Sequence, residues 1–267
     1  MIILTETYKD LEESIATICN CSVDFLYKVL SDFYYQCIDD SNKYDKMIDC
    51  FINENANLYL IDEVCIYHLA RHFSEPIELL PLKDLLLTEN AFSAFLAENN
   101  IVFKENNGQL ELYYKQQLIK PQDLLSDRHH LLLAKRLGYF SEADYCINGF
   151  AFWPDIEETS DGYYEELRIS PEFIRKIGDF LDIDLCREYA ARTKYYGIVF
   201  IAKLNEITFD GNKNMITKEE KALYLLRCSL LTLHSHYFDC PSSLYNPMIR
   251  IDDTAKAKVH HCILINE

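Results

Sequence analysis

The sequence has little glycine and little proline, with seven residues of each in 267. Its hydrophobic content is nonetheless 49%, so the chain is neither low-complexity nor disordered. The glycines are scattered, and neither GxGxxG nor GxxxxGKS or GxxxxGKT occurs. Loops that bind dinucleotides or nucleotide phosphates need clustered glycines at these fixed spacings, so both kinds of site are excluded.

Long apolar runs and targeting signals are also missing. No run reaches the roughly 18 apolar residues that a membrane-spanning helix needs, and neither end carries a signal-peptide or lipidation pattern. The ten cysteines are dispersed, contain no CxxC pair and lie mostly in apolar surroundings. We therefore expect reduced, buried thiols in a cytoplasmic protein without a membrane partner.

Motifs for metal binding or nucleophilic catalysis do not occur either. There is no HExxH, no EF-hand loop and no GxSxG. His234 and His236 are two residues apart in a helical pattern, where their rings diverge by about 200°. We expect no metal site. Ten cysteines and eight histidines permit a Cys-His dyad, but no spacing specifies one.

Basic residues are also scarce relative to acidic residues. The chain has 26 Lys and Arg residues against 43 Asp and Glu residues, which gives a formal net charge of −17, and it contains no basic run. A surface this acidic repels nucleic-acid backbones and anionic membranes, so we do not expect nucleic acid as a partner. The same charge favours fast association with a basic protein.

What the sequence does contain is apolar periodicity, and residues 5–52 show it at helical spacing. We expect residues 1–56 to form a helical N-terminal region that docks onto an α+β core domain of residues 57–267. The clearest helix follows an N-cap at Ser22. Its apolar residues recur every three or four positions and predict one buried face: Phe25, Leu26, Val29, Leu30 and Phe33.

The rest of the chain mixes strands and helices without a regular βαβ rhythm. This favours an α+β fold with mainly antiparallel strands over a doubly wound sheet. Asn107-Gly108 lies between two alternating runs and predicts a hairpin. Thr217 and Glu220 have the spacing of a capping box. The expected strands are 58–73, 101–104, 109–114, 144–156, 195–209 with a bend near Asn205, and 258–265.

Helices are expected between these strands. One follows a cap at Thr88, one lies within 121–142 and is closed by Gly138, and one starts at Ser170-Pro171. A further helix covers 218–238. The acidic residues 157–167 read as a loop.

The longest β-prone run ends in a compact group of polar side chains, Tyr67, His68, Arg71 and His72. Side chains at the end of a strand can face a cleft while the strand fixes their positions. The structural alternative is that His68 is satisfied within the core and that Arg71 pairs with a nearby carboxylate.

The segment 67–71, Tyr-His-Leu-Ala-Arg, resembles the first core strand of the ADP-ribosyltransferase fold. The later order is compatible with that fold: a helix, a hairpin, an aromatic segment with Tyr145 and Gly149, and a late strand with Glu206. The resemblance implies an enzyme that uses NAD as its substrate and splits the bond between nicotinamide and ribose.

The resemblance also assigns roles to residues. His68 and Arg71 would hold NAD, and Glu206 would stabilise the oxocarbenium-like transition state by its charge. The nicotinamide would stack on Tyr145, and Tyr67 and Gly149 would complete the NAD-binding site. The alternative for Glu206 is a charge on an edge strand that faces water.

Three functions are compatible with these observations. The first is an ADP-ribosyltransferase-like enzyme, of the kind found in toxins or phage-defence effectors. The second is a non-catalytic acidic interaction protein, a regulator or an immunity or anti-defence protein, that binds a basic protein. The third is a hydrolase with carboxylates drawn from Asp144, Asp155 and Glu157. Whether the protein is an enzyme stays open between them.

Overall fold

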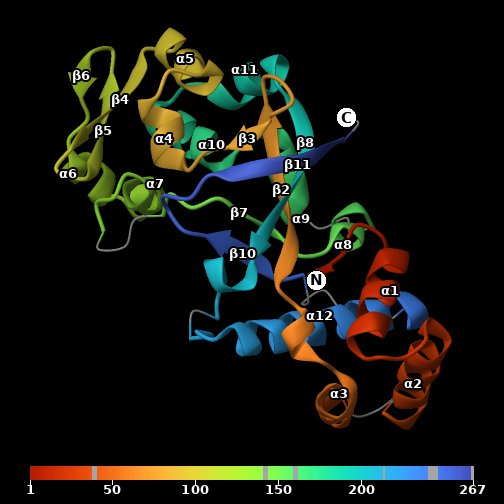
Figure 1. Cartoon of the computed structure of the whole chain (residues 1–267). Coiled ribbons are helices and arrows are strands. Elements are labelled where there is room, and N and C mark those ends of the chain that lie inside the picture. The colour runs from red at the N-terminus through yellow and green to blue at the C-terminus, as the bar shows by residue number, and fades with distance from the viewer. Residues whose placement is uncertain (38–40, 141–143, 159–161, 213, 240–245, 266–267) are drawn as a thin grey trace. The chain divides into compact units, whose positions relative to one another are not determined.

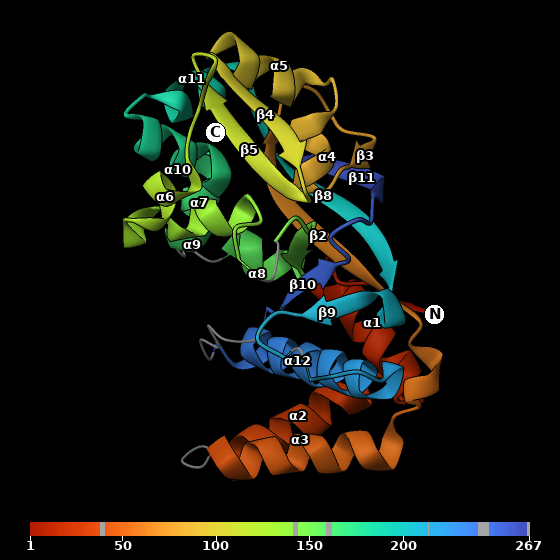
Figure 2. The ribbon, with the colours of Figure 1, turned by 90° about the vertical axis from the view of Figure 1, so that its left-hand side faces the viewer.

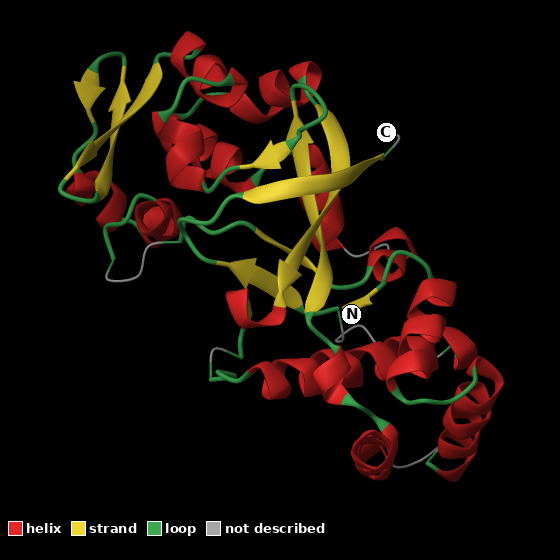
Figure 3. Cartoon of the chain, viewed as in Figure 1, coloured by secondary structure: helices red, strands yellow, loops and turns green. Residues whose placement is uncertain are grey.

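The computed structural model describes residues 1–37, 41–140, 144–158, 162–212, 214–239 and 246–265. Its helices and mainly antiparallel strands form the α+β fold that the sequence predicted (Figure 3). The chain divides into two compact units. The first unit contains Met1–Tyr67, Asn148–Thr159 and Ile201–Arg250, and the second contains His68–Ile147, Ser160–Phe200 and Ile251–Glu267.

These units do not follow the boundary that the sequence placed at residue 56. The N-terminal helices α1 (Tyr8–Ile18), α2 (Val23–Gln36) and α3 (Ser41–Asn55) all contact α12 (Lys218–Phe238), which follows much later in the chain (Figure 1). The helical region is therefore one part of a larger unit, because a distant helix covers its apolar faces.

Helix α12 is the centre of the first unit. Figure 2 shows it between the α2–α3 pair and the strands β9 (Ile207–Phe209) and β10 (Met248–Ile251). Most of its residues from Lys221 to Leu233 are buried, as expected for a helix that is apolar on nearly every side. Even Lys221 is only 5% exposed, and its ammonium group donates a hydrogen bond to the Ile207 carbonyl at 2.6 Å.

The start of α12 confirms the predicted capping box. The Thr217 hydroxyl oxygen accepts from the Glu220 N–H at 3.1 Å, and the Glu220 carboxylate accepts from the Thr217 N–H at 2.9 Å. Two N–H groups that the helix leaves unpaired are thereby satisfied.

Strands lie beside this helical part in the order β2-β7-β10-β9 within the first unit. β2 (Glu63–His72) pairs in parallel with β1 (Ile2–Ile3), and β7 (Asn148–Phe150) pairs antiparallel with both β2 and β10. The remaining elements of this unit are η1 (Leu58–Leu60), α8 (Trp153–Glu158) and η3 (Leu204–Glu206).

The second unit has its own strands in the order β3-β11-β8-β2. β11 (Ala257–Leu264) pairs antiparallel with both β3 (Glu78–Leu79) and β8 (Lys194–Lys203). β2 and β8 contribute to both units, which divide after Tyr67 and after Phe200. The helices of the second unit are α4 (Leu82–Leu87), α5 (Ala91–Glu98), α6 (Pro121–Leu125), η2 (Arg128–His130), α7 (Leu131–Arg136), α9 (Gly162–Ile169), α10 (Glu172–Leu181) and α11 (Leu185–Arg192).

A separate three-stranded sheet of the second unit confirms the predicted hairpin (upper left in Figure 3). It contains β4 (Ile101–Asn106), β5 (Gln109–Tyr114) and β6 (Gln117–Leu118). Asn107 and Gly108 have φ angles of 52° and 81°, the left-handed values that a two-residue hairpin turn of type I′ requires. Inward residues of β4 and β5 join a hydrophobic core with the neighbouring helices.

The acidic segment expected to be a loop is partly helical. Residues 157–167 contain the end of α8 and most of α9. The strand expected at 144–156 is correspondingly shorter, because β7 ends at Phe150 and α8 begins at Trp153. Pro154 explains this change, since proline cannot donate to a strand ladder but suits the first turn of a helix.

Two predicted helix caps are wrong. Helix α5 is capped by Asn90 instead of Thr88, because the Asn90 side-chain oxygen accepts from the N–H groups of Phe92 and Ser93 at 2.9 and 3.0 Å. Helix α10 starts at Glu172 without a side-chain cap. Ser170 does not cap it, since its hydroxyl donates to the Cys186 thiol sulfur at 3.1 Å.

The helix predicted within 121–142 is divided into α6, η2 and α7. Asp127 starts a new turn, because its side chain accepts from the His129 N–H at 2.9 Å. Gly138 does follow the end of α7, with a φ of 79°, as a glycine helix stop requires.

The described residues bear on the expected state of the cysteines and on the expected absence of a membrane-spanning helix. The cysteines among them are all free thiols. No helix in the described ranges is both long enough and apolar enough to cross a membrane.

His234 on α12 is enclosed by aromatic rings. The ring centroids of Tyr44, Phe238 and Tyr34 lie 4.3, 5.0 and 5.7 Å from its own, and its Nε2 is buried without a hydrogen-bond partner among the described residues. Burial lowers the pKa of His234 from 6.5 to about 4. The folded protein therefore keeps this imidazole neutral at pH values at which the unfolded chain protonates it.

We predict that the free energy of unfolding falls as the pH drops from 6.5 to 4, and that His234→Phe removes part of the loss. Above pH 6.5 the imidazole is neutral in both states, whereas below it the unfolded state binds more protons and is favoured. The part removed is on the order of 1–3 kcal/mol. Urea unfolding at pH 7 and pH 4.5 measures it, with His129→Phe on the surface as the matched control. An unchanged pH dependence in His234→Phe would contradict the assignment.

Candidate functional site

The polar group at the end of β2 is divided between two faces of the strand. Tyr67 and Arg71 are 0% and 4% exposed, whereas His68, Ala70 and His72 are half-buried. The division follows the pleat, which points alternate side chains to opposite faces. The face with the two histidines is the partly accessible one.

Tyr67 is a core residue of the first unit. Its ring centroid lies 5.7 Å from that of Trp153, and its hydroxyl oxygen accepts a hydrogen bond from Thr5 at 3.3 Å. Gly149 lies beside it on β7. A Cβ at Gly149 would stand 2.7 Å from both the Tyr67 carbonyl oxygen and the Ile66 side chain. The structure thus brings Tyr67 and Gly149 together, and close packing of two strands explains the glycine.

Arg71 is buried in the second unit, where its guanidinium group donates to four acceptors among the described residues. Nε donates to the Thr193 hydroxyl at 3.1 Å and Nη1 to the Arg168 carbonyl at 2.7 Å. Nη2 donates to the carbonyls of Ala190 and Thr193 at 3.1 and 2.9 Å. Arg168 and Ala190 lie in the last turns of α9 and α11, where unpaired carbonyls carry partial negative charge.

The acceptors of Arg71 are themselves connected. The Tyr189 hydroxyl donates to the Arg71 carbonyl at 2.8 Å, and the Thr193 hydroxyl donates to the Tyr189 carbonyl at 2.6 Å. Arg71 therefore holds the ends of α9 and α11 against β2. This is a structural role, in which carbonyls at the helix ends accept hydrogen bonds from the cation.

His68 and His72 lie on the same face of β2, separated by Ala70. Burial, and to a lesser extent the nearby His68, lower the pKa of His72 to about 4. His72 is therefore neutral at pH 7 and offers one donor and one acceptor nitrogen.

Tyr145 and Glu206 belong to different units. Tyr145 is 6% exposed in the apolar core of the second unit, and its N–H donates to Asp253 at 2.8 Å. Glu206 ends the η3 turn of the first unit, with its side chain 56% exposed and 3.6 Å from the Lys203 ammonium group. This turn is the bend predicted near Asn205, so Glu206 is not in a strand.

The residues implicated by the resemblance are therefore distributed over both units. Tyr67, Gly149 and Glu206 lie in the first unit, whereas His68, Arg71 and Tyr145 lie in the second.

A possible metal-ligand group occurs in the second unit. Donor atoms of Asp144, Cys146 and Asp253 lie within 4.8 Å of one another. The Asp144 carboxylate is already 3.2 Å from Arg136 and 3.7 Å from Lys135. Because the protein's own cations compensate this carboxylate, we assign no metal to the group. For the hydrolase hypothesis, Asp144 is this ion-paired residue, and the side chains of Asp155 and Glu157 lie outside the described part.

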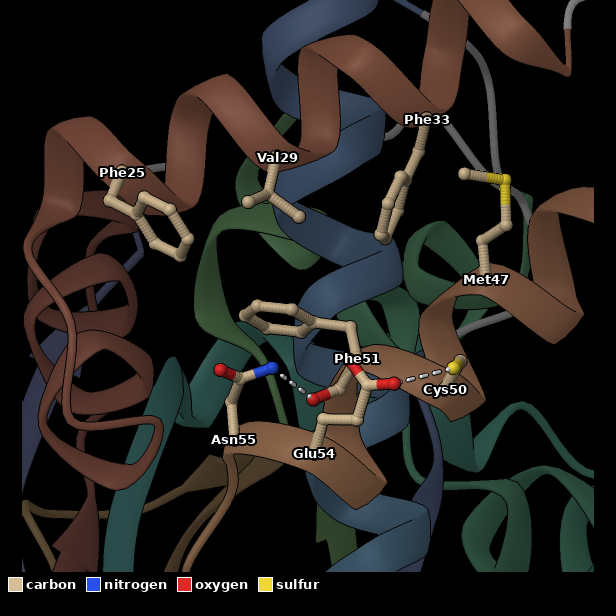
Figure 4. Close-up of a pocket in the computed structure, with 8 residues that line it drawn as sticks. All are labelled: Phe25, Val29, Phe33, Met47, Cys50, Phe51, Glu54 and Asn55. Carbon is tan, nitrogen blue, oxygen red and sulfur yellow. Dashed lines mark hydrogen bonds between the residues drawn. The ribbon is translucent and has the colours of Figure 1, made fainter.

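The sequence did not reveal a hydrophobic groove between α2 and α3, shown in Figure 4. This α2–α3 groove lies within the first unit and has a volume of about 380 Å³, within the usual size range of ligand-binding cavities. It is lined by Phe25, Val29 and Phe33 from α2 and by Met47, Cys50, Phe51, Glu54 and Asn55 from α3.

The groove exists because α2 has two apolar stripes. Leu26 and Leu30 are fully buried, whereas Phe25 is 47% exposed and lines the groove with Val29. The sequence analysis assigned all of these residues to one buried face. The sequence signal for two stripes was the adjacent apolar pairs at positions 25–26 and 29–30. The arc of helix surface that these pairs occupy is wider than the arc that one neighbouring element covers.

The α3 side of the groove combines an apolar floor with a polar edge. Phe51 is 5% exposed, and its ring centroid lies 6.4 Å from that of Phe33 in an edge-on arrangement. The exposed Cys50 thiol donates to the Glu54 carboxylate at 3.3 Å. This hydrogen bond and the charge of Glu54 raise the pKa of the Cys50 thiol. The groove therefore carries one carboxylate at its edge and one accessible thiol.

No protein-family model, no curated protein and no solved structure matches this chain. The assignment of function therefore rests on the residues and their geometry.

We predict that Arg71→Ala destabilises the second unit by about 3–5 kcal/mol, because it leaves buried carbonyl and hydroxyl groups without their donor. Arg71→Lys should recover only part of this loss, since an ammonium group cannot reproduce the guanidinium fork. Urea unfolding measures both variants.

The matched control is Arg192→Ala, which removes an exposed ion pair with Glu98 at 2.6 Å and should cost less than about 1 kcal/mol. Similar losses in Arg71→Ala and Arg192→Ala would show that Arg71 does not hold the unit together.

Proposed function

We propose that this protein is an acidic interaction protein that binds a basic protein partner through its first unit. The observation that carries the proposal is the concentration of charge. Residues 1–67 contain 13 acidic and four basic residues, a net charge of −9 within a total of −17. Part of this charge lies on the two helices that form the α2–α3 groove, which together carry five acidic and three basic residues, a net charge of −2.

Several acidic side chains here are available to a partner. Asp24, Asp32 and Glu54 are exposed on α2 and α3, and they make no ion pair within the described residues. By contrast, Asp45 and Asp49 are occupied by Arg227, at 3.0 and 2.9 Å. Uncompensated carboxylates on one surface attract a basic partner and speed its association.

A charge-reduced variant tests this function. Capture from source-cell extract with the full chain should yield a basic protein, and the purified partner should bind directly. Asp24→Asn, Asp32→Asn and Glu54→Gln together should weaken that binding about ten-fold and reduce its salt dependence.

The matched control removes the same charge from exposed positions of the second unit, with Glu89→Gln, Asp179→Asn and Glu188→Gln. Equal weakening in the two triple variants would contradict a role for the first unit. A partner that is itself acidic would contradict the proposal as a whole.

A second candidate function is NAD use by an ADP-ribosyltransferase-like enzyme. Its support is the half-buried histidine face of β2, on which His68 and His72 lie. Arg71 donates to helix carbonyls and Glu206 is a surface residue of the first unit. This candidate therefore assigns NAD contacts to His68 and His72.

Isothermal titration of NAD into the full chain tests the second candidate. Binding at millimolar NAD should be lost in His68→Ala and kept in His260→Ala, which replaces an exposed histidine on β11. Arg71→Ala is unsuitable here because it removes a structural clamp. The absence of heat from a folded protein at millimolar NAD would contradict NAD use.

A further inference from the structure

We infer that the α2–α3 groove binds an amphipathic basic α-helix of the partner. This inference rests on the proposed function and adds to it the binding site and the conformation of the bound segment.

The shape of the groove fits a helix. Its walls are two helices that run antiparallel, with Phe25 opposite Glu54 and Asn55 and with Phe33 opposite Met47 (Figure 4). From residue 25 to residue 33, α2 rises by roughly 12 Å, or about two turns. A helical ligand places apolar side chains at i, i+3 or i+4, and i+7 over the same length.

The lining of the groove fits apolar anchors. Phe25 keeps 47% of its surface exposed, although its neighbour Leu26 is fully buried. A partly exposed aromatic ring beside an apolar floor gains binding energy when a partner side chain covers it. Met47 adds a flexible side chain that can adapt to anchors of different shape.

The charged residue in the groove lining favours a basic helix. Glu54 lies at the Phe25 end, and the exposed Asp32 precedes Phe33 at the other end. The basic residues of the two helices are Lys28 on α2 and Lys43 and Lys46 on α3, and none of the three is among the residues that line the groove. Lysine or arginine on the flanks of a bound helix can reach the two carboxylates, whereas an acidic helix would meet the charge of Glu54 in the groove lining.

Other occupants are disfavoured by the same charges. A second copy of this chain carries the same net charge of −17, which opposes self-association through this surface. A fatty acid brings a carboxylate that would meet Glu54.

A pair of synthetic peptides tests the inference. The first has 14 residues, with leucine at helical i, i+4, i+7 and i+11 positions and lysine elsewhere, and the second has glutamate in place of each lysine. Binding is measured by fluorescence anisotropy. Occupancy of the groove is measured by alkylation of Cys50, an exposed thiol in its lining.

The basic peptide should bind and slow Cys50 alkylation about ten-fold at saturation, while the acidic peptide should do neither. Cys262 in the second unit is the internal control for alkylation. Binding that leaves Cys50 unprotected, or equal binding of both peptides, would overturn the inference. Equal binding would instead indicate a site for apolar ligands in general.

Two variants of α2 locate the site. Phe25→Ala should weaken peptide binding about ten-fold, whereas Tyr35→Ala, which removes a side chain 72% exposed outside the groove lining, should leave it unchanged. Circular dichroism checks that both variants fold. Equal affinities for Phe25→Ala and Tyr35→Ala would overturn the inference.

The same variant separates this inference from the proposed function. A natural partner that depends on Asp24, Asp32 and Glu54 but not on Phe25 would leave the proposed function standing and remove the groove as its site. The inference requires that partner binding be weakened by both kinds of change.

Discussion

The second unit depends on the hydrogen bonds of one buried cation. Arg71 is 4% exposed. Its charged guanidinium group would be unstable in an apolar interior without hydrogen-bond acceptors. The ends of α9 and α11 supply carbonyl acceptors, and Tyr189 returns a hydrogen bond to the Arg71 backbone. One side chain thus fixes two helix ends on β2. The half-buried histidine face of the same strand is consequently held on a rigid base.

Arg71 also explains why a five-residue resemblance could not assign a role. An arginine near a strand end donates equally well to a ligand phosphate and to the carbonyls of a helix C-terminus, because both present negatively charged oxygens. Its acceptors lie 97 to 122 residues further along the chain. Local sequence carries no information about partners at that distance. The same limit applies to Tyr145, whose N–H group is bound by Asp253, 108 residues away.

The features predicted correctly are those that neighbouring residues decide. The turn at Asn107-Gly108 and the capping box at Thr217 depend on side chains within a few positions, and both occur as predicted. Helix α9 was missed because its acidic sequence has little apolar periodicity, and its end is stabilised by a donor from β2. The prediction that Glu206 lies in a strand was wrong for a related reason. Glu206 lies in the turn between β8 and β9, and tertiary strand pairing decides where such a turn occurs.

The two apolar stripes of α2 cannot both be buried against the first unit. Burying Leu26 and Leu30 against the unit leaves the adjacent Phe25 and Val29 at the surface, where apolar groups promote association with any hydrophobic surface. A net charge of −9 on residues 1–67 repels other copies of the same chain. That repulsion is absent for a basic segment. For the proposed function, charge therefore favours a basic segment over a second copy of this chain as the ligand that covers Phe25.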